Sequence, residues 1–457
     1  MDQSAIIEQL IRAGQLPTPD KIRSMLQQEM VSVPIKKHSV ENGETSVQIL
    51  TNETYSPQKI EVKDFVNYFR GRHNYFKNVL INRPELSNAT SIARLSGNTK
   101  TSIIAAIVDI KRLSTGTMKL QLEDLSGRIS AIISAKNPEA LAKAQSLCLD
   151  EVVAFKGSSG KSIFFVDDIT WPDIPPKQRA RTPDEVYMAC LSDVHVGSRM
   201  FLPKTLNKFL KWLNGNYGNA RQRAIADKTK YIVVCGDIVD GVGIYPSQEK
   251  ELKITDIYKQ YDVTAKLFSK ISDDKQVIMI PGNHDAMRIE EHQPRLYKDL
   301  ATPLYELPNV HMAPNPANVI IHKKDNFPGV HLLMYHGYSF DYFVENIASL
   351  REAGGYDAAD KLWEFLLKRR HLAPTYGATL ALPMNEDPLL IREVPDIAIS
   401  GHIHKSKIGS YKGVQTISCS CFQDTTSFQQ RMGHHPNPGV VPLVNLQTGK
   451  AWSLRFK

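Results

Sequence analysis

Residues 187–198 read YMACLSDVHVGS, an apolar run that ends in a turn carrying Asp193 and His195. Four later segments have the same form: YIVVCGDIVDG at 231–241, VIMIPGNHD at 277–285, HLLMYHG at 331–337 and DIAISGHIH at 396–404. Unbroken apolar runs suit strands that are buried on both faces of a sheet, and α/β folds place their sites at the carboxyl ends of such strands. Residues 180–457 are therefore predicted to form an α/β domain with its site at one sheet edge.

The turns after these five runs supply two carboxylates, one amide oxygen and four imidazoles. The residues are Asp193, His195, Asp237, Asn283, His336, His402 and His404. One Asp-x-His or His-x-His pair alone is equally typical of a solvated turn or of a hydrogen-bonded core histidine. Five such turns, in order and each closing an apolar strand, are not explained by chance, and their seven donor groups are too many for one ion. They match two ions that share a bridging carboxylate and leave positions open for water and substrate.

The donor types narrow the choice of metal. Magnesium prefers oxygen ligands and keeps several of its waters, whereas four imidazoles suit softer ions. Two manganese ions are therefore expected, with iron or zinc as the alternatives.

A second domain is predicted ahead of the first. Residues 102–111, 118–134, 151–157 and 162–169 alternate as strands do, and residues 138–147 have helical spacing. Short strands with one helix resemble an OB-fold barrel, here placed at 96–175, which binds either single-stranded nucleic acid or a protein. Residues 1–30 are predicted to form a short helical segment. Residues 31–95 are expected to be a polar linker followed by a helix at 62–80 that packs on the barrel.

Composition sets broader limits. The 457 residues are 42% hydrophobic and 23% charged, which is ordinary for a globular protein. No apolar run reaches the length of a membrane span and the N-terminus lacks the features of a signal peptide, so a cytoplasmic location without membrane contact is expected. The net charge of +8 is compatible with a polyanionic partner. The five cysteines are scattered and are expected to be reduced thiols.

The series Asp-x-His, Gly-Asp, Gly-Asn-His-Asp, a histidine after a strand, and Gly-His-x-His resembles the motifs of calcineurin-like metallophosphoesterases. The resemblance implies a sandwich of sheets flanked by helices. It also implies a first ion held by Asp193, His195, Asp237 and His404, and a second held by Asp237, Asn283, His336 and His402. His284 is then the histidine that faces the substrate without binding metal and acts as the catalytic residue.

A closer resemblance covers most of the chain. The barrel before the phosphoesterase, the segment KRRHLAPTYG at 368–377 and the ending GHHPNPGVVPLVNL at 433–446 are similar to the small subunits of archaeal family-D DNA polymerases. This resemblance implies a two-metal 3′→5′ exodeoxyribonuclease that proofreads during DNA replication. Its expected partners are the large catalytic subunit of the polymerase and DNA with single-stranded or mismatched 3′ ends.

Basic residues that follow the ligand turns closely are candidates for DNA phosphate contacts: Arg288, Arg295, Lys405 and Lys407. The segment 338–393 is expected to be a helical insertion, in which Lys368, Arg369 and Arg370 either contact DNA or face solvent. Two other functions remain open. One is a stand-alone phosphodiesterase or phosphatase, which would share the metal site, and the other is a mainly scaffolding subunit for the large chain.

Overall fold

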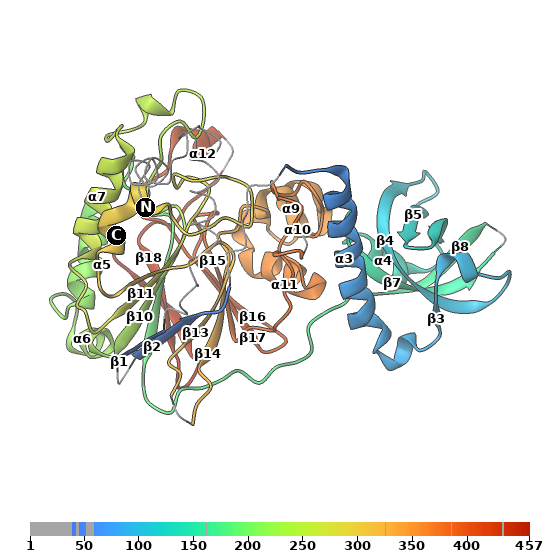
Figure 1. Cartoon of the computed structure of the whole chain (residues 1–457), viewed down its shortest axis with the longest axis horizontal. Helices are drawn as coiled ribbons and strands as arrows, with labels where there is room; N and C mark the ends of the chain where they lie inside the picture. The colour runs from blue at the N-terminus through green and yellow to red at the C-terminus, as the bar shows by residue number, and fades with distance from the viewer. Residues whose placement is uncertain are drawn as a thin grey trace, which may run out of the picture. The chain divides into compact units, whose positions relative to one another are not determined.

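The computed structural model describes residues 39–42, 45–51, 59–160, 162–324, 326–384, 386–431 and 434–457. The helical segment expected at residues 1–30 lies outside this range. The described chain contains two large sheets, a small barrel and the helices that cover them (Figure 1).

The first large sheet has six strands in the order β12-β11-β10-β9-β18-β19. Its strands are β9 (Tyr187–Leu191), β10 (Thr229–Cys235), β11 (Gln276–Ile280), β12 (Val310–Met312), β18 (Val440–Asn445) and β19 (Ala451–Arg455). Strands β9 to β12 pair in parallel, so their carboxyl ends meet at one edge. Three of the five predicted strands therefore lie side by side.

The second large sheet has seven strands in the order β1-β2-β13-β14-β15-β17-β16. They are β1 (Ser39–Asn42), β2 (Thr45–Ile49), β13 (Ala317–Ile321), β14 (Val330–Met334), β15 (Ile397–Ser400), β16 (Lys407–Tyr411) and β17 (Val414–Ser418). Strands β14 and β15, the other two predicted strands, pair in parallel. Their carboxyl ends bring His336, His402 and His404 to one edge of this sheet.

Side chains alternate between the two faces of each strand, and this alternation shows which layers each sheet packs against. On β9, Met188 and Cys190 pack between the two sheets, against residues such as Leu332 and Ile399. Their neighbours Ala189 and Leu191 point the other way, into the core beneath the helices. Helices α5 (Pro203–Leu213), α6 (Ala220–Asp227), α7 (Ile257–Phe268) and α8 (Lys298–Tyr305) belong to that outer layer.

The insertion covers the opposite face. Helices α9 (Phe340–Asn346), α10 (Ala348–Glu352) and α11 (Ala359–Arg369) bury Trp363 and Leu366 against Leu333 and Ala398 of the second sheet. A short helix, α12 (Ser427–Arg431), follows near the end of the chain. The order helix, sheet, sheet, helix confirms the predicted α/β sandwich flanked by helices, and the helical insertion.

Two parts of the expected linker are strands, β1 and β2. Residues 45–49 form β2, which pairs antiparallel with β13 through Val47, Gln48 and Ile49. Val47 is buried in the core between the two large sheets. The alternation of polar and apolar residues over TSVQI is too short to stand out in a polar stretch. Its partner strand lies about 270 residues further along the chain, so pairing decides its structure.

The smaller unit is a closed barrel. Its strands are β3 (Ala89–Thr90), β4 (Lys100–Arg112), β5 (Met118–Asp124), β6 (Gly127–Ile133), β7 (Val152–Ser159) and β8 (Ile163–Thr170). The order β4-β5-β6-β8-β7 returns to β4 through a β4–β7 pairing, with helix α4 (Pro138–Ala144) between β6 and β7. Five strands closed in this order form the predicted OB-fold barrel.

Helix α3 (Val62–Ile81) connects the barrel with the insertion. Phe76 and Leu80 pack on barrel residues, and the Arg72 guanidinium is 2% exposed and lies 2.7 Å from Asp387. A second buried pair joins Arg369 of α11 to Glu151 of the barrel at 2.9 Å. The basic segment 368–371 thus contributes to a junction between folded units. Arg369 was expected either to contact DNA or to face solvent, but it is buried in this junction. We define Arg72, Asp387, Arg369 and Glu151 as the junction pairs.

Candidate metal centre

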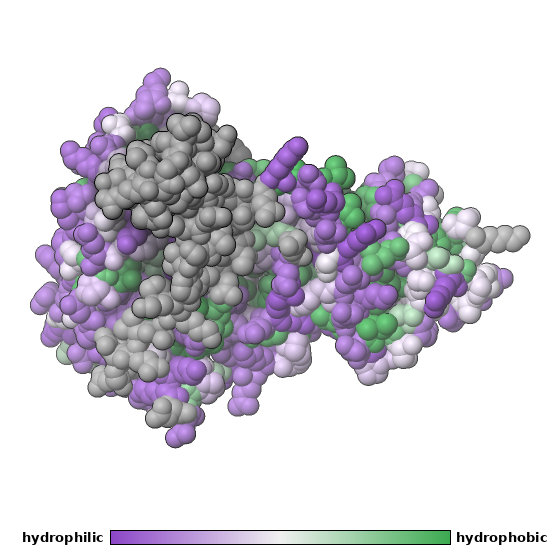
Figure 2. Space-filling model, in the orientation of Figure 1, coloured by the Kyte–Doolittle hydropathy of each residue, from purple (hydrophilic) through white to green (hydrophobic). Residues whose placement is uncertain are grey.

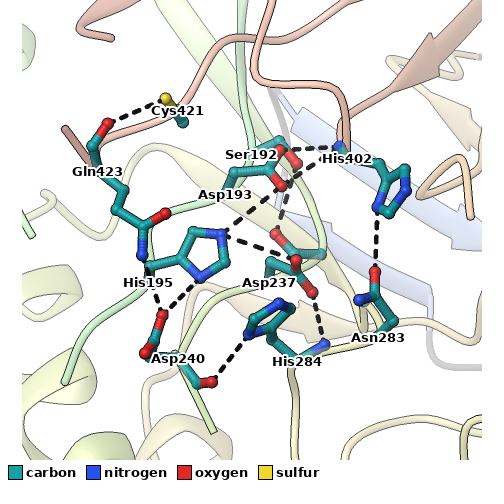
Figure 3. Close-up of polar contacts among 12 residues, drawn as sticks. Ser192, Asp193, His195, Asp237, Asp240, Asn283, His284, His402, Cys421 and Gln423 are labelled. Atoms are coloured by element: carbon teal, nitrogen blue, oxygen red, sulfur yellow. Dashed lines mark hydrogen bonds and ion pairs between the residues drawn. The ribbon is translucent and has the colours of Figure 1, made fainter. Parts of the chain in front are cut away.

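The predicted ligands come together at the shared edge of the two sheets, and Figure 3 labels five of them: Asp193, His195, Asp237, Asn283 and His402. Asp193 and His195 follow β9, Asp237 follows β10 and Asn283 follows β11. The remaining three come from the second sheet, with His336 after β14 and His402 and His404 after β15. Because each residue follows a buried strand of fixed register, the sandwich places all seven from five separate segments.

The backbone at these turns is constrained. Asp193, His195, Asp237, His402 and His404 all have φ between 50° and 70°, the left-handed region that side chains other than glycine seldom adopt. Such conformations cluster at functional sites and persist only where the surrounding fold enforces them. Five left-handed residues among seven predicted ligands therefore mark this edge as a site on backbone evidence alone.

Two glycines allow the turns to approach one another. A Cβ on Gly282 would lie 2.2 Å from the Asp237 carboxylate, and one on Gly401 would overlap Ser192 and Asp193. Any side chain at either position would therefore displace a predicted ligand.

The donor atoms form two clusters. In the first, Nε2 of His404 lies 3.2 Å from Nε2 of His195 and 3.2 Å from the Asp193 carboxylate. In the second, the Asn283 side-chain oxygen lies 2.9 Å from Nε2 of His336 and 3.1 Å from Nδ1 of His402. These clusters contain the donors expected for the first and second ions.

Asp237 lies between the two clusters. Its Oδ2 is 3.7 Å from Nε2 of His195 and 3.5 Å from Nε2 of His336. One carboxylate therefore faces both histidines at nearly equal distances, which is the position that a bridging ligand requires.

The outward nitrogens of three histidines are held by acceptors. Nδ1 of His195 donates to Asp240 at 3.0 Å, and Nδ1 of His336 donates to the carbonyl of Cys235 at 2.7 Å. Nε2 of His402 donates to Asp341 at 2.8 Å. Each outward nitrogen thus carries the proton, so the inward nitrogen of each neutral ring presents a lone pair.

Lone pairs then face carboxylate and amide oxygens across distances of 2.9 to 3.9 Å. Acceptors do not bind one another, so the neutral rings favour cations, either protons or metal ions, between them. The donor set of nitrogen and oxygen atoms at two points that share Asp237 fits two divalent ions. The geometry fits a divalent-metal site without specifying the element.

The pKa values of the buried ligands also indicate that the centre attracts positive charge. Burial disfavours the charged forms of both His336 and Asp237. Asp237 nevertheless raises the pKa of His336 to about 10, and His336 holds the pKa of Asp237 well below its usual range. The centre attracts positive charge, so metal ions must compete with protons for the imidazoles.

Asp285 ties the ligand turns together. Its carboxylate accepts backbone N–H bonds from Gly282 at 2.8 Å, Val239 at 3.2 Å and Ile238 at 3.3 Å. Burial, and then the nearby Asp237, raise the pKa of Asp285 to about 7. Asp285 thereby joins the turn after β10 to the turn after β11.

His284 lies against the first cluster. Its backbone N–H donates to Asp237 at 2.8 Å, and its Nδ1 donates to the carbonyl of Asp240 at 2.9 Å. The second contact leaves Nε2 as the nitrogen available to a substrate. Burial lowers the pKa of His284, so the free ring is neutral near pH 7.

The four candidate phosphate contacts differ in their settings. Lys405 pairs with Asp357 at 2.6 Å, and Lys407 lies 3.9 Å from Asp360. Arg288 donates to the carbonyl of His292, and Arg295 is half-buried. Only Lys405 lies within two residues of a predicted ligand, because it follows His404 directly.

Residues that support the ligands were not identified from the sequence. Asp240 contacts His195 and also accepts from Gln423 at 3.0 Å, whereas Asp341 contacts His402 from helix α9. Asp240 could have been found from the sequence, because it lies three residues after Asp237 in the same turn. Nothing in the local sequence marks Asp341, because the insertion places it beside a ligand 61 residues away.

The family model of calcineurin-like phosphoesterases matches residues 187–406, the stretch that contains all seven predicted ligands. Those residues form a phosphoesterase domain of that class, and enzymes of the class use divalent metals.

Relatives extend the match to most of the chain. DNA polymerase II small subunits of Methanothermobacter thermautotrophicus, Methanocaldococcus jannaschii and Archaeoglobus fulgidus are 39%, 37% and 36% identical to it. The matches cover 84%, 84% and 86% of this chain, and 78%, 64% and 77% of those proteins. The chain belongs to the family of DNA polymerase II small subunits. Among the described residues, no helix is long and apolar enough to cross a membrane.

Proposed function

We propose that this chain is the 3′→5′ exonuclease of a heteromeric archaeal DNA polymerase and proofreads the growing strand during replication. The observation that carries the proposal is Asp237, which lies between two complete donor clusters in a chain of the polymerase small-subunit family. A subunit with only a scaffolding task would not need seven metal donors held in place by further carboxylates.

The reaction is the hydrolysis of a phosphodiester. A water oxygen bonds to phosphorus, the bond from phosphorus to the 3′ oxygen of the preceding nucleotide breaks, and a proton passes to that oxygen. The products are a 5′-mononucleotide and a strand one unit shorter. Two bound dications, manganese in our proposal, would make water more acidic and offset charge on the non-bridging phosphate oxygens.

The chain's own residues hold and orient the reactants. Asp193, Asp237 and the four histidines fix the centre, while His284 presents Nε2 toward the substrate. An anionic phosphodiester beside His284 favours its imidazolium form, which can donate a proton to the departing oxygen. Lys405 is the best-placed of the proposed DNA contacts, which also include Arg288, Arg295 and Lys407.

We propose that the barrel contacts the large subunit. Figure 2 shows hydrophobic residues between the hydrophilic ones over the barrel. Val108, Leu113, Leu125 and Phe165 of the barrel are 39 to 55% exposed. Apolar side chains of this kind favour a protein surface as partner. The large subunit would then bring DNA to the centre in the cytoplasm and raise its effective concentration there.

The test uses the full chain, alone and in complex with the large subunit, on single-stranded DNA with manganese. We expect weak, salt-sensitive removal of 3′ nucleotides by the chain alone, and stronger, more salt-resistant removal by the complex. Native purification should return the chain with a polymerase.

The alternatives have their own outcomes in this test. Hydrolysis of a phosphoserine peptide without DNA cleavage would identify a phosphatase. A chain that purifies alone with full nuclease activity would identify a stand-alone phosphodiesterase. If the complex polymerises normally and neither preparation shows metal-dependent cleavage, the chain would be a scaffolding subunit.

A further inference from the structure

A cavity of about 290 Å³ adjoins the metal ligands, and of its lining residues only Lys405 has a role in the chemistry described so far. Ile403, which lines it, sits between His402 and His404, so cavity and ligands share one loop. Another wall is the short 3₁₀ helix η4 (Gly355–Asp357) of the insertion, and a third is His434. A substrate with its phosphorus at the ligands would have its next chemical unit within reach of this cavity.

The cavity offers an aromatic surface. The rings of Tyr356 and His434 lie 4.3 Å apart, centroid to centroid, at an angle of 50°. Nucleobases stack on such side chains with little dependence on sequence. The volume lies near the lower end of the range for small-molecule sites, so it admits one unit of a strand and excludes a duplex.

The charge of the lining favours an anion. Arg351, Lys405 and two histidines line the cavity, and the one acidic residue among the lining residues that the structure describes is Asp357. Asp357 is already paired with Lys405 at 2.6 Å. Arg351 donates to the carbonyl of Glu345, which does not neutralise its charge.

His434 has an unused polar atom. Its Nε2 is buried and has no hydrogen-bond partner among the residues described in the structure. A buried ring nitrogen without a partner is costly, and a bound base or sugar hydroxyl would supply one.

The cavity is also connected to the metal centre. The Tyr356 hydroxyl donates a hydrogen bond to the Asp341 carboxylate. Asp341 in turn accepts from Nε2 of His402 at 2.8 Å. One carboxylate thus contacts both the wall of the cavity and a predicted ligand of the second ion.

We propose that this cavity binds the 3′-terminal nucleoside of a DNA strand, with its base against Tyr356 and His434 and its 5′ phosphodiester at the metal ligands. The proposal rests on the exonuclease function and deepens it. A base must leave its pair and its stack before it can enter the cavity, so the site would select frayed or mismatched ends by shape.

Two small substrates separate the cavity from the metal centre. The p-nitrophenyl ester of thymidine 5′-monophosphate carries a terminal nucleoside on its phosphodiester, whereas bis(p-nitrophenyl) phosphate carries none. We expect the wild-type chain to prefer the nucleoside ester in kcat/KM. In Tyr356→Ala the ratio of the two kcat/KM values should fall by roughly tenfold or more, as expected for a lost stacking contact.

Two further variants sharpen the comparison. Tyr356→Phe keeps the ring and should retain most of the preference. Tyr258→Ala removes a tyrosine of α7 that is 58% exposed, and it should leave both substrates unaffected. An unchanged ratio in Tyr356→Ala would overturn the cavity proposal, as would an equal loss on both substrates.

A binding measurement makes the result independent of catalysis. Titration calorimetry of the full chain with thymidine 5′-monophosphate and Mn²⁺ should show binding that weakens roughly tenfold or more in both Tyr356→Ala and His434→Ala. If the wild-type chain hydrolyses neither ester, alone or in complex with the large subunit, the exonuclease function fails, yet the titration still decides the cavity. Equal affinity of wild type and variants for the nucleotide would overturn the assignment even if both esters were cleaved.

Discussion

Asp341 Oδ2 accepts a hydrogen bond from Nε2 of His402 at 2.8 Å, although the two residues belong to different elements, helix α9 and the turn after β15. The contact fixes the tautomer in which Nδ1 of His402 faces Asn283. Helix α9 of the insertion therefore sets the orientation of a predicted metal ligand.

The first prediction follows from that contact. Asp341→Ala should weaken binding of the second ion by about 10–100-fold and leave the first ion bound, because a freed imidazole ring loses its orientation. Calorimetric titration with Mn²⁺ measures both sites. Glu352→Ala, which removes an exposed carboxylate from α10, serves as the control and should bind as wild type does. Equal weakening of both sites would contradict a specific role at His402.

The second prediction concerns Asp237. Asp237→Ala should abolish nuclease activity and lower the metal content below one ion per chain, because its carboxylate faces both clusters. Metal analysis after desalting measures the content. Two ions retained in this variant would show that Asp237 does not bridge.

The third prediction separates His284 from the ligands. His284→Ala should keep both ions and lose about 10²-fold or more of the turnover, as expected when a proton donor or charge stabiliser is removed. The paired measurement is metal content and kcat on the same preparation. Loss of the ions, or normal cleavage, would show that the role of His284 is wrong.

The fourth prediction concerns the junction pairs. Burial would raise the pKa of Asp387, but Arg72 more than offsets this and holds it below its usual range. Arg72→Met leaves the carboxylate buried with Tyr68 and His371 as its remaining ionisable partners. We expect a loss of about 3–5 kcal/mol in the free energy of unfolding near pH 7.

The pH dependence of that loss has a definite sign. Without Arg72, we expect burial, the largest effect on Asp387, to outweigh His371 and the Leu389 N–H and to raise its pKa in the folded state above the unfolded value of about 4. The folded variant then binds a proton that the unfolded chain does not, so its deficit relative to wild type should shrink as the pH falls from 7 to 5. Urea unfolding at both pH values measures it, with Arg70→Ala on the exposed side of α3 as control. A constant deficit would show that Asp387 does not titrate.

The fifth prediction concerns the form of the DNA. Single strands and mismatched 3′ termini should lose nucleotides faster than matched duplex, since pairing keeps the terminal base away from the centre. Gel analysis of DNA labelled at the 5′ end and at an internal position follows the shortening. Degradation that starts only at 5′ ends would contradict the proposed polarity.

The five apolar runs made the phosphoesterase strands predictable, because a strand buried on both faces must be apolar throughout. The ligands were predictable too, because they follow the ends of these strands. The barrel was predictable for a similar reason, since residues 118–134 contain a complete hairpin. By contrast, β2 and Asp341 depend on partners that are distant in sequence, so local pattern carries no information about them. Arg369 looked like a surface charge because its partner, Glu151, belongs to another folded unit.

The left-handed backbone at Asp193, His195, Asp237, His402 and His404 has a practical consequence for anyone who wants to trap this protein on DNA. An alanine at such a position removes the donor, and alanine lacks the polar side chain that makes Asp, Asn and His more frequent in left-handed backbone. Asparagine adopts this conformation more readily and nearly keeps the shape of aspartate. Asp193→Asn and Asp237→Asn are therefore the substitutions most apt to give an inert protein whose turns, and whose grip on a DNA end, survive intact.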